Sequence, residues 1–264
     1  AQDRATGRNI TIAIIDSAID LQHPELSGSV ISAYDAIARG GRRGGMPHGT
    51  AIASIIAAHG ELTGVAPDAR LASVRAFSRS ASTGPALSTT RALLKGLDWA
   101  YGQKARIFNL SFAGPRDPLF IRALERLGKE GAILIAAAGN EGPRSPRLYP
   151  AAANTVIAVT ATNNKDELFS AASQGDYVEI ASPGVEILVA SPGAGFGFLS
   201  GTSMAAAHVS ALAALILEQN PAISTSRIRK ILQTTADDLG KKGPDTRFGA
   251  GRVNALAAIR AAGP

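Results

Sequence analysis

The chain has 264 residues, 45% of them hydrophobic and 5% aromatic, with a formal net charge of +6. This length and composition suit a well-buried core rather than a fibrous or disordered chain, and no apolar run nears the roughly 20 residues of a membrane span. The basic residues are scattered apart from Arg39, Arg42 and Arg43, which argues against a nucleic-acid groove, and the absence of cysteine excludes disulfides and thiol catalysis.

Apolar runs alternate with helical patterns along the chain. The runs predict buried strands over residues 10–15, 30–33, 71–77, 107–110, 132–137, 155–160 and 178–181, and a Gly-rich hairpin within 187–199. Helices are expected over 51–58, 90–103, 119–129, 224–235 and 252–261. An Ala-rich helix also begins near Thr202 and Ser203, and either hydroxyl can cap it. The alternation predicts an α/β fold with a doubly wound, mostly parallel central sheet, helices on both faces, and a single domain over 1–264.

Polar side chains stand where the predicted strands end and the helices begin. Asp16, Ser111 and Asn140 each follow a strand, whereas His48 and Ser203 open helices. In doubly wound folds the functional site lies at the carboxyl ends of the strands, so these residues can converge on one edge. A serine hydroxyl becomes a nucleophile when a neutral imidazole takes its proton, and a carboxylate holds that imidazole in the required tautomer. The pattern therefore indicates an Asp-His-Ser arrangement.

Four short segments carry a more specific signal: residues 15–20 (IDSAID), 48–50 (HGT), 137–140 (AAGN) and 201–205 (GTSMA). In type and in order they resemble the signature segments of the subtilisin-like serine proteases, the subtilase family. The resemblance implies a three-layer αβα fold and a serine endopeptidase that forms an acyl-enzyme. It assigns Ser203 as the nucleophile, His48 as general base and then acid, and Asp16 as the partner that orients His48. Asn140 and the main-chain N–H of Ser203 would bind the oxyanion.

The same resemblance places an extended peptide substrate against two strand edges, one at 111–113 and one near 81–85. Ala113 and Leu148 stand where relatives usually carry smaller residues. We therefore expect a shallow S1 pocket that prefers small or medium apolar P1 residues. The full predicted substrate-binding set is Ser111, Phe112, Ala113, Gly139, Leu148 and Thr202.

No cofactor is expected. Residues 57–64 are too compact for the tight calcium loop of the family, since calcium takes about six to eight oxygen ligands and Glu61 is the candidate carboxylate there. We therefore expect that site to be absent and the protein to be calcium-independent. A weak cation site near Ala151, Ala153 and Glu179 stays open.

The remaining histidines receive structural interpretations. The resemblance assigns His23 to a short turn after the first strand, which Asp20 would support, and His59 lies in a predicted loop. His208 is five residues past Ser203, on a different side of the helix, and is expected in the core or between helices.

The resemblance also implies partners and a location. Relatives are made with an inhibitory propeptide, so we expect a removed propeptide, polypeptide substrates and a monomer with no nucleic-acid or membrane partner. A secreted or periplasmic mature form is expected, and an intracellular one is left open. Arg42 and Arg43 either favour acidic substrate residues or form a solvated loop.

Two other functions compete with this interpretation. One is a catalytically silent scaffold of the same fold that binds proteins, although a scaffold has no need of all four catalytic residues. The other is a dinucleotide-binding enzyme, which the sequence disfavours because the Gly193-Ala194-Gly195 stretch continues with Phe198 where the third glycine belongs.

Overall fold

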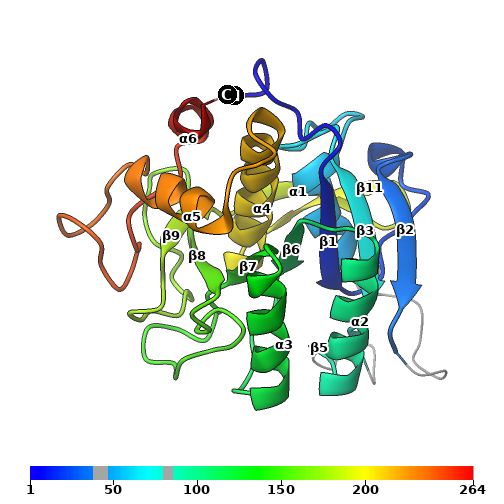
Figure 1. Ribbon diagram of the computed structural model, residues 1–264, viewed down its shortest axis with the longest axis horizontal. Helices are drawn as coiled ribbons and strands as arrows, with labels where there is room; N and C mark the ends of the chain where they lie inside the picture. The colour runs from blue at the N-terminus through cyan, green and yellow to red at the C-terminus, as the bar shows by residue number, and fades with distance from the viewer. Residues whose placement is uncertain (38–46, 80–85, 264) are drawn as a thin grey trace.

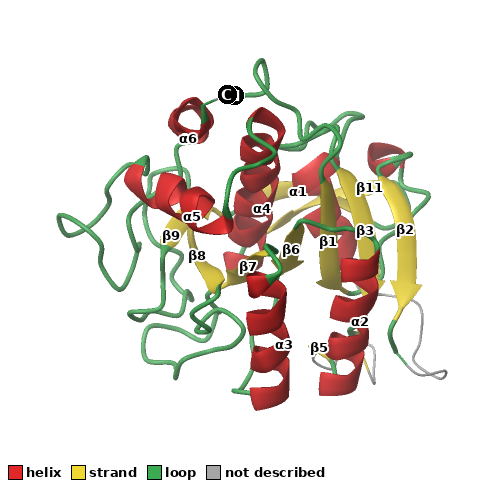
Figure 2. Cartoon of the chain, viewed as in Figure 1, coloured by secondary structure: helices red, strands yellow, loops and turns green. Residues whose placement is uncertain are grey.

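The computed structural model of the protein describes residues 1–37, 47–79 and 86–263. The predicted basic cluster of Arg39, Arg42 and Arg43 and the predicted substrate edge at 81–85 lie outside the described residues. A seven-stranded sheet forms the centre of the molecule (Figures 1 and 2), and every neighbouring pair in it is parallel. Its strand order is β2 (Val30–Asp35), β3 (Arg70–Arg75), β1 (Thr11–Asp16), β6 (Ile107–Leu110), β7 (Ile133–Ala137), β8 (Val156–Thr162) and β9 (Ile180–Pro183).

Helices cover both faces of this sheet, which confirms the predicted doubly wound, three-layer architecture. Figure 1 shows α2 and α3 side by side on one face. The other face carries α1, α4, α5 and α6, whose apolar residues share one core with the sheet. Their bounds are α1 (His48–Ala57), α2 (Thr90–Gly102), α3 (Pro118–Lys129), α4 (Thr202–Gln219), α5 (Thr225–Thr234) and α6 (Ala255–Ala262).

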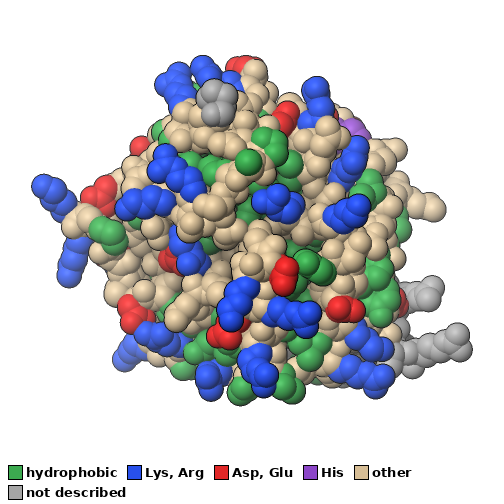
Figure 3. All heavy atoms as spheres, viewed as in Figure 1, with side chains coloured by type: hydrophobic (Ala, Val, Ile, Leu, Met, Phe, Trp, Pro, Cys, Tyr) green, Lys and Arg blue, Asp and Glu red, His purple; other side chains and the backbone are tan. Residues whose placement is uncertain are grey.

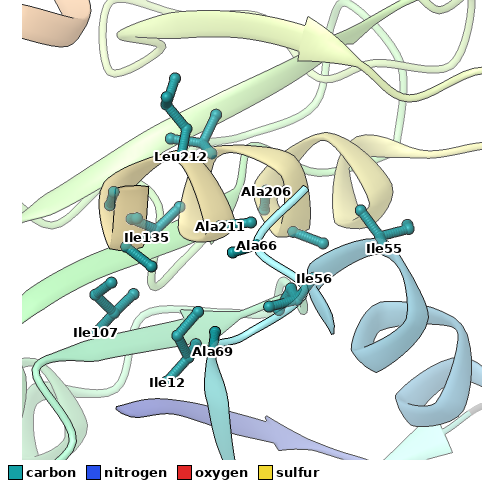
Figure 4. Packing of buried hydrophobic residues seen from close by; sticks show 14 of the residues in the cluster. Ile12, Ile55, Ile56, Ala66, Ala69, Ile107, Ile135, Ala206, Ala211 and Leu212 are labelled. Atoms are coloured by element: carbon teal, nitrogen blue, oxygen red, sulfur yellow. The ribbon is translucent and has the colours of Figure 1, made fainter. Parts of the chain in front are cut away.

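The apolar strands build two cores because alternate residues point to opposite faces of a sheet. In β1, Ile12 and Ile14 belong to the core under α1 and α4, whereas Ala13 and Ile15 belong to the core under α2 and α3. Figure 4 shows the first core, where isoleucines of three strands and of α1 lie around α4. The labelled residues are Ile12, Ile55, Ile56, Ala66, Ala69, Ile107, Ile135, Ala206, Ala211 and Leu212. Alanines on α4 allow the helix to approach the sheet closely.

Two short hairpins and one helical turn complete the described structure. β10 (Ile187–Ser191) pairs antiparallel with β11 (Gly195–Leu199), as the Gly-rich stretch predicted. The hairpin of β4 (Ser78–Arg79) and β5 (Ala86–Leu87) was not predicted. The 3₁₀ turn η1 (Pro24–Leu26) follows His23, whose Nδ1 accepts the N–H of Glu25.

The sequence placed several element boundaries wrongly. The strand expected over 71–77 ends at Arg75, and the one expected over 178–181 begins at Ile180. The helix expected from residue 252 begins at Ala255, because the main chain of Arg252 pairs instead with Asp237 in both directions (2.8 and 2.9 Å). Asn254 then caps the helix by accepting the N–H of Ala257 at 3.0 Å.

The surface carries dispersed charge. On the face drawn in Figure 3, Lys and Arg side chains are spread among few acidic ones rather than gathered in a stripe. In the part of the chain that the structure describes, no helix combines the length and the apolar composition that a membrane span needs.

Candidate active site

Asp16 and His48 form a close pair at the carboxyl edge of the sheet. Asp16 ends β1 and is buried, and His48 opens α1. The Nδ1 of His48 lies 2.9 Å from Oδ1 and 2.8 Å from Oδ2 of Asp16. A carboxylate only accepts, so Nδ1 donates, and in the neutral ring Nε2 keeps its lone pair. The side chain of His48 is 32% exposed, so the pair can meet a substrate.

The surroundings of His48 act on its pKa in opposite directions. Burial disfavours the imidazolium and lowers the pKa, whereas the charge of Asp16 and the hydrogen bond to it raise the pKa. The two effects of Asp16 together outweigh burial, and the pKa of His48 lies above its ordinary value. Asp16 therefore stabilises the protonated ring, as a residue that orients a general base must do.

Close packing between the end of β1 and the start of α1 fixes this pair. The N–H of Gly49 donates to the hydroxyl of Ser17 at 2.9 Å. A Cβ on Gly49 would lie 2.4 Å from the carbonyl oxygen of Ser17, so a larger residue would push the helix away. Glycine at this position keeps His48 within reach of Asp16.

Ser203 lies in the first turn of α4, and its hydroxyl donates to the carbonyl of Ser111 at 2.9 Å. The expectation that Thr202 or Ser203 caps the helix is therefore wrong. Gly201 is the N-cap residue, and it offers no side-chain cap. The hydroxyl of Thr202 instead donates to Oδ1 of Asn140 (3.0 Å) and accepts the N–H of Gly139 (3.1 Å). Within the described residues no hydrogen bond joins Ser203 Oγ to His48; the two side chains line one pocket.

Asn140 follows β7 and presents its amide to the same pocket. Its Oδ1 accepts the main-chain N–H of Thr202 at 3.0 Å, which settles which end of the amide is oxygen. Neither Asn140 Nδ2 nor the main-chain N–H of Ser203 has an acceptor among residues 1–37, 47–79 and 86–263. Gly201 has a φ of +154°, and a Cβ there would lie 3.2 Å from Nδ2. The site thus holds two free N–H donors beside the serine.

One pocket of about 360 Å³ gathers seven of the ten predicted site residues: Asp16, His48, Ser111, Phe112, Ala113, Asn140 and Ser203. The sequence missed its other three lining residues, Phe77, Ala86 and Glu141. Only their positions in the sequence could have pointed to two of them. Phe77 is the last residue of the strand predicted over 71–77, and Glu141 directly follows Asn140.

The remaining three predicted residues, Gly139, Leu148 and Thr202, do not line this pocket. Leu148 and Thr202 are buried. A Cβ on Gly139 would lie 2.3 Å from Cδ1 of Leu148, so this leucine fills the space behind Gly139. Gly114 and Tyr149 exchange main-chain hydrogen bonds at 2.8 and 2.9 Å, which ties the segment of Leu148 to the predicted substrate edge.

The other histidines lie away from this pocket. His23 is buried, its Nε2 lies 3.1 Å from the carbonyl of Gly195, and its ring meets Phe196 edge-on. The Nδ1 of His59 lies 3.1 Å from the carbonyl of Ala57. Nδ1 of His208 lies 2.9 Å from the carbonyl of Met204, and burial lowers the pKa of this histidine. Asp20 supports its turn, as predicted, by accepting the N–H of Gln22 at 3.1 Å.

The loop after α1 is hydrogen-bonded to a carboxylate of the same chain. The buried carboxylate of Glu25 accepts the N–H groups of Gly60 (3.2 Å), Glu61 (2.6 Å) and Leu62 (3.0 Å). N–H groups that converge on one point attract anions and repel cations. Three N–H groups at residues 60–62 therefore suit an anion, whereas a tight calcium ion needs about six to eight oxygen ligands.

The carboxylate of the second candidate cation site is paired with a guanidinium. Nε of Arg229 lies 3.2 Å from Oε2 of Glu179, and its Nη1 donates to the carbonyl of Asn154 at 2.9 Å. Burial raises the pKa of Glu179, despite Arg229 and a hydrogen bond from Gln233, which act to lower it. A metal bound by Glu179 would compete with Arg229 for this carboxylate. Among the described residues there is no group of three or more His, Cys, Asp or Glu side chains that could hold a metal ion.

Comparison with known proteins gives consistent results. The model of the subtilase family (Peptidase_S8) matches residues 7–251. Thermitase of Thermoactinomyces vulgaris is 34% identical over 266 residues, which cover 98% of this chain and 92% of that protein. The minor extracellular protease Epr of Bacillus subtilis (strain 168) is 34% identical over 253 residues, 94% of this chain but 38% of that protein.

Two solved structures share the fold. Fervidolysin from Fervidobacterium pennivorans, a keratinolytic enzyme related to subtilisin, superposes with a TM-score of 0.89 at 29% identity, covering 100% of this chain and 44% of that one. The prenylagaramide maturation protease PagA superposes with a TM-score of 0.82 at 28% identity, covering 96% and 93% of the two chains. The family match, the relatives and the shared fold agree with the four signature segments, and the chain belongs to the subtilase family.

Proposed function

We propose that the chain is a serine endopeptidase in which Ser203, His48, Asp16 and Asn140 carry out the reaction. One observation supports this most directly. A histidine oriented by a buried carboxylate shares a pocket with a serine and two free N–H donors. Base, nucleophile and oxyanion donors are the parts that acyl transfer needs.

The first half of the reaction forms an ester on Ser203. Its Oγ attacks the carbonyl carbon of the scissile bond while its proton passes to Nε2 of His48. The carbonyl oxygen becomes an oxyanion, which accepts hydrogen bonds from Asn140 Nδ2 and the Ser203 N–H. The C–N bond then breaks as His48 returns the proton to the leaving amine. Water attacks the ester by the same route and releases the second product.

Substrate binding prepares this attack. The Ser203 hydroxyl donates to the Ser111 carbonyl at 2.9 Å. A peptide that lies extended along residues 111–113 offers its own N–H to that carbonyl. The hydroxyl is then released to donate to Nε2 of His48, so the nucleophile is activated once the substrate is in place.

The wall behind Gly139 supports a preference for small or medium apolar P1 residues. Leu148 fills the space there, and the Gly114–Tyr149 pairing ties its segment to the segment that carries Ala113. A peptide library should give most cleavage after Ala, Val or Leu, and Leu148→Gly should extend cleavage to Phe and Tyr. A wild-type profile dominated by Phe or Tyr at P1 would refute this preference.

Labelling with a serine-directed fluorophosphonate tests the activity itself. Intact mass should increase by one adduct per chain, mapped to Ser203, and Ser203→Ala should not react. A folded chain that takes up no adduct, even after treatment with a second protease to clear the site, would favour the silent protein-binding scaffold.

We infer that the protein folds and works without calcium. Glu25 supplies an internal anion to residues 60–62, and Arg229 supplies an internal cation to Glu179. A chelator should leave the melting temperature unchanged. A rise of several degrees with added calcium, reversed by the chelator, would overturn this inference.

We further infer that the chain acts as an exported monomer after removal of an inhibitory propeptide. The relative Epr is described as an extracellular protease. Sequencing the N-terminus of the protein recovered from its native source, together with sedimentation at micromolar concentration, tests processing, location and oligomeric state. A cytoplasmic, unprocessed or dimeric protein would contradict the corresponding part.

A further inference from the structure

β6 carries an amide in the middle of an apolar layer. Asn109 is fully buried, and at the same register its neighbours on the adjoining strands are Ile14 and Ile135. Both isoleucines belong to the core under α4. An aliphatic side chain would fill this position without the cost of burying an amide, so packing alone does not explain an asparagine here.

Hydrogen bonds at both ends of the amide link β6 to α4. Oδ1 of Asn109 accepts the hydroxyl of Ser210 at 2.9 Å, and Nδ2 donates to the hydroxyl of Ser111 at 2.8 Å. The hydroxyl of Ser111 donates in turn to the carbonyl of Ser203 at 3.0 Å. Ser203 and Ser210 are seven residues apart, so they share one face of α4 about 10 Å apart along its axis.

The direction of these bonds depends on Asn109. An amide nitrogen only donates, so the Ser111 hydroxyl must accept from Nδ2 and point its own proton elsewhere. That proton goes to the carbonyl of Ser203. The amide thereby holds the first turn of the helix through Ser111 and its third turn through Ser210, which fixes the helix both along its axis and in rotation.

We propose that Asn109 is a positioning residue for the nucleophile: it ties α4 to β6 so that Ser203 meets His48 and the substrate in the required geometry. This rests on the proposed function, since the residue it positions is the proposed nucleophile. Asn109 itself does not line the pocket and touches no reacting group. Small displacements of a nucleophile reduce the rate of attack strongly, because attack needs close and aligned atoms.

Asn109→Leu tests the proposal, with Thr160→Val as the matched control. Thr160 is also fully buried in the central sheet, and its hydroxyl has no hydrogen-bond partner among the described residues. We expect Asn109→Leu to lower kcat and the rate of fluorophosphonate labelling about 10- to 100-fold, with KM within about twofold of wild type. The acid limb of the pH profile should not move, because Asp16 and His48 keep their contact. Thr160→Val should change none of these values more than about twofold.

Further measurements distinguish a failure of the positioning role from a failure of the proposed activity. If wild type and folded Asn109→Leu label at equal rates, the positioning role is wrong while the proposed activity stands. If Asn109→Leu does not fold, Ser210→Ala should still label about threefold more slowly than wild type, and an unchanged rate overturns the proposal. If wild type itself does not label, the proposed activity fails. Hydrogen exchange of backbone amides then tests, without any activity, whether Asn109 ties α4 to β6. Amides in the first turn of α4 should exchange faster in Asn109→Leu than in Thr160→Val, and equal rates overturn the proposal.

Discussion

The six α-helices in the described part of the chain fall into two groups that begin in different ways. The N-cap side chain of four helices, α2, α3, α5 and α6, accepts a main-chain N–H of the first turn; these caps are Thr89, Asp117, Ser224 and Asn254. The other two helices, α1 and α4, have Pro47 and Gly201 as N-cap residues, and neither residue makes a side-chain cap. These two carry His48 and Ser203.

Burial differs in the same way. Nine of the ten residues of α1 and fifteen of the eighteen of α4 are buried, against three of twelve in α3. An outer helix buries one stripe and gains from local signals at its ends, whereas a helix enclosed on all sides is stabilised by packing. Among the described residues the N–H of Ser203 is left without an acceptor, and a capping side chain would compete for it. In the proposed mechanism this N–H binds the oxyanion, so the packing of the core stabilises α4 while its uncapped end serves the reaction.

Asp16→Asn should have the largest effect on kcat, because Asp16 orients the histidine at the start of α1. An Asn at this position favours the wrong tautomer of His48, and kcat should fall about 10⁴-fold. In wild type the raised pKa of His48 keeps the ring protonated up to higher pH, so the acid limb of kcat/KM should lie above pH 6.5. Without the charge of Asp16, burial alone lowers the pKa, and the residual activity should show its limb below pH 6.5.

The control for this variant is Asp20→Asn, four residues along the same chain. Asp20 accepts the N–H groups of Gln22 and Gly193 and does not line the pocket. Its replacement should leave the acid limb in place. An unshifted limb in Asp16→Asn would contradict the account of the His48 pKa.

Asn140→Leu should have the next largest effect: kcat should fall by a factor of about 10²–10³, and KM should change little. That magnitude is the one measured for loss of the corresponding donor in subtilisin, a relative of this chain. The physical reason is that the amide meets a charge that develops only during attack. Steady-state kinetics on a peptide ester and a peptide amide check it. A raised KM with unchanged kcat would show that Asn140 binds substrate and does not stabilise the oxyanion.

Truncating a leucine should destabilise the protein more in α4, which is almost entirely buried, than in α3, which is mostly exposed. Leu212→Ala, in the buried face of α4, should lower the free energy of unfolding by about 2–5 kcal/mol. Leu119→Ala, in α3, should cost less than about 0.5 kcal/mol, since that side chain is 60% exposed. Urea titrations of both variants measure the difference. Similar losses would mean that the outer helix is as tightly packed as the inner one.

Loss of a cap should produce the smallest effect. Ser224→Ala removes the hydroxyl that accepts the N–H of Arg227 at 3.2 Å, and should cost about 1 kcal/mol without changing kcat. Lys230→Ala, at an exposed position further along α5, is the control and should cost less than about 0.5 kcal/mol. Equal costs would show that the cap contributes nothing specific.

The sequence predicted that Asp16 and His48 lie together, from the resemblance to subtilases and from local signals. Asp16 follows a continuous apolar run and His48 opens an apolar helix, and the carboxyl edge of a parallel sheet brings such positions together. The partner of Ser203 was not predictable in this way. Its hydroxyl donates to Ser111, 92 residues away, and depends on the angle at which α4 crosses β6.

The role of Asn109 was missed for the same reason. One polar residue inside the run Ile107–Leu110 was a signal, but its partner Ser210 lies 101 residues away on a helix. The wrong start of the last helix has a similar cause: Arg252 pairs with Asp237, and local helix propensity cannot anticipate a tertiary main-chain pairing.

The tie between Glu25 and the loop after α1 bears on the survival of the protein among its own copies. A peptidase that cuts extended segments can digest any loop that straightens, including those of neighbouring molecules. Residues 60–62 cannot straighten while a buried carboxylate accepts their three N–H groups. We therefore expect the loop that leaves α1 to resist self-digestion because of an anion that the chain supplies to itself.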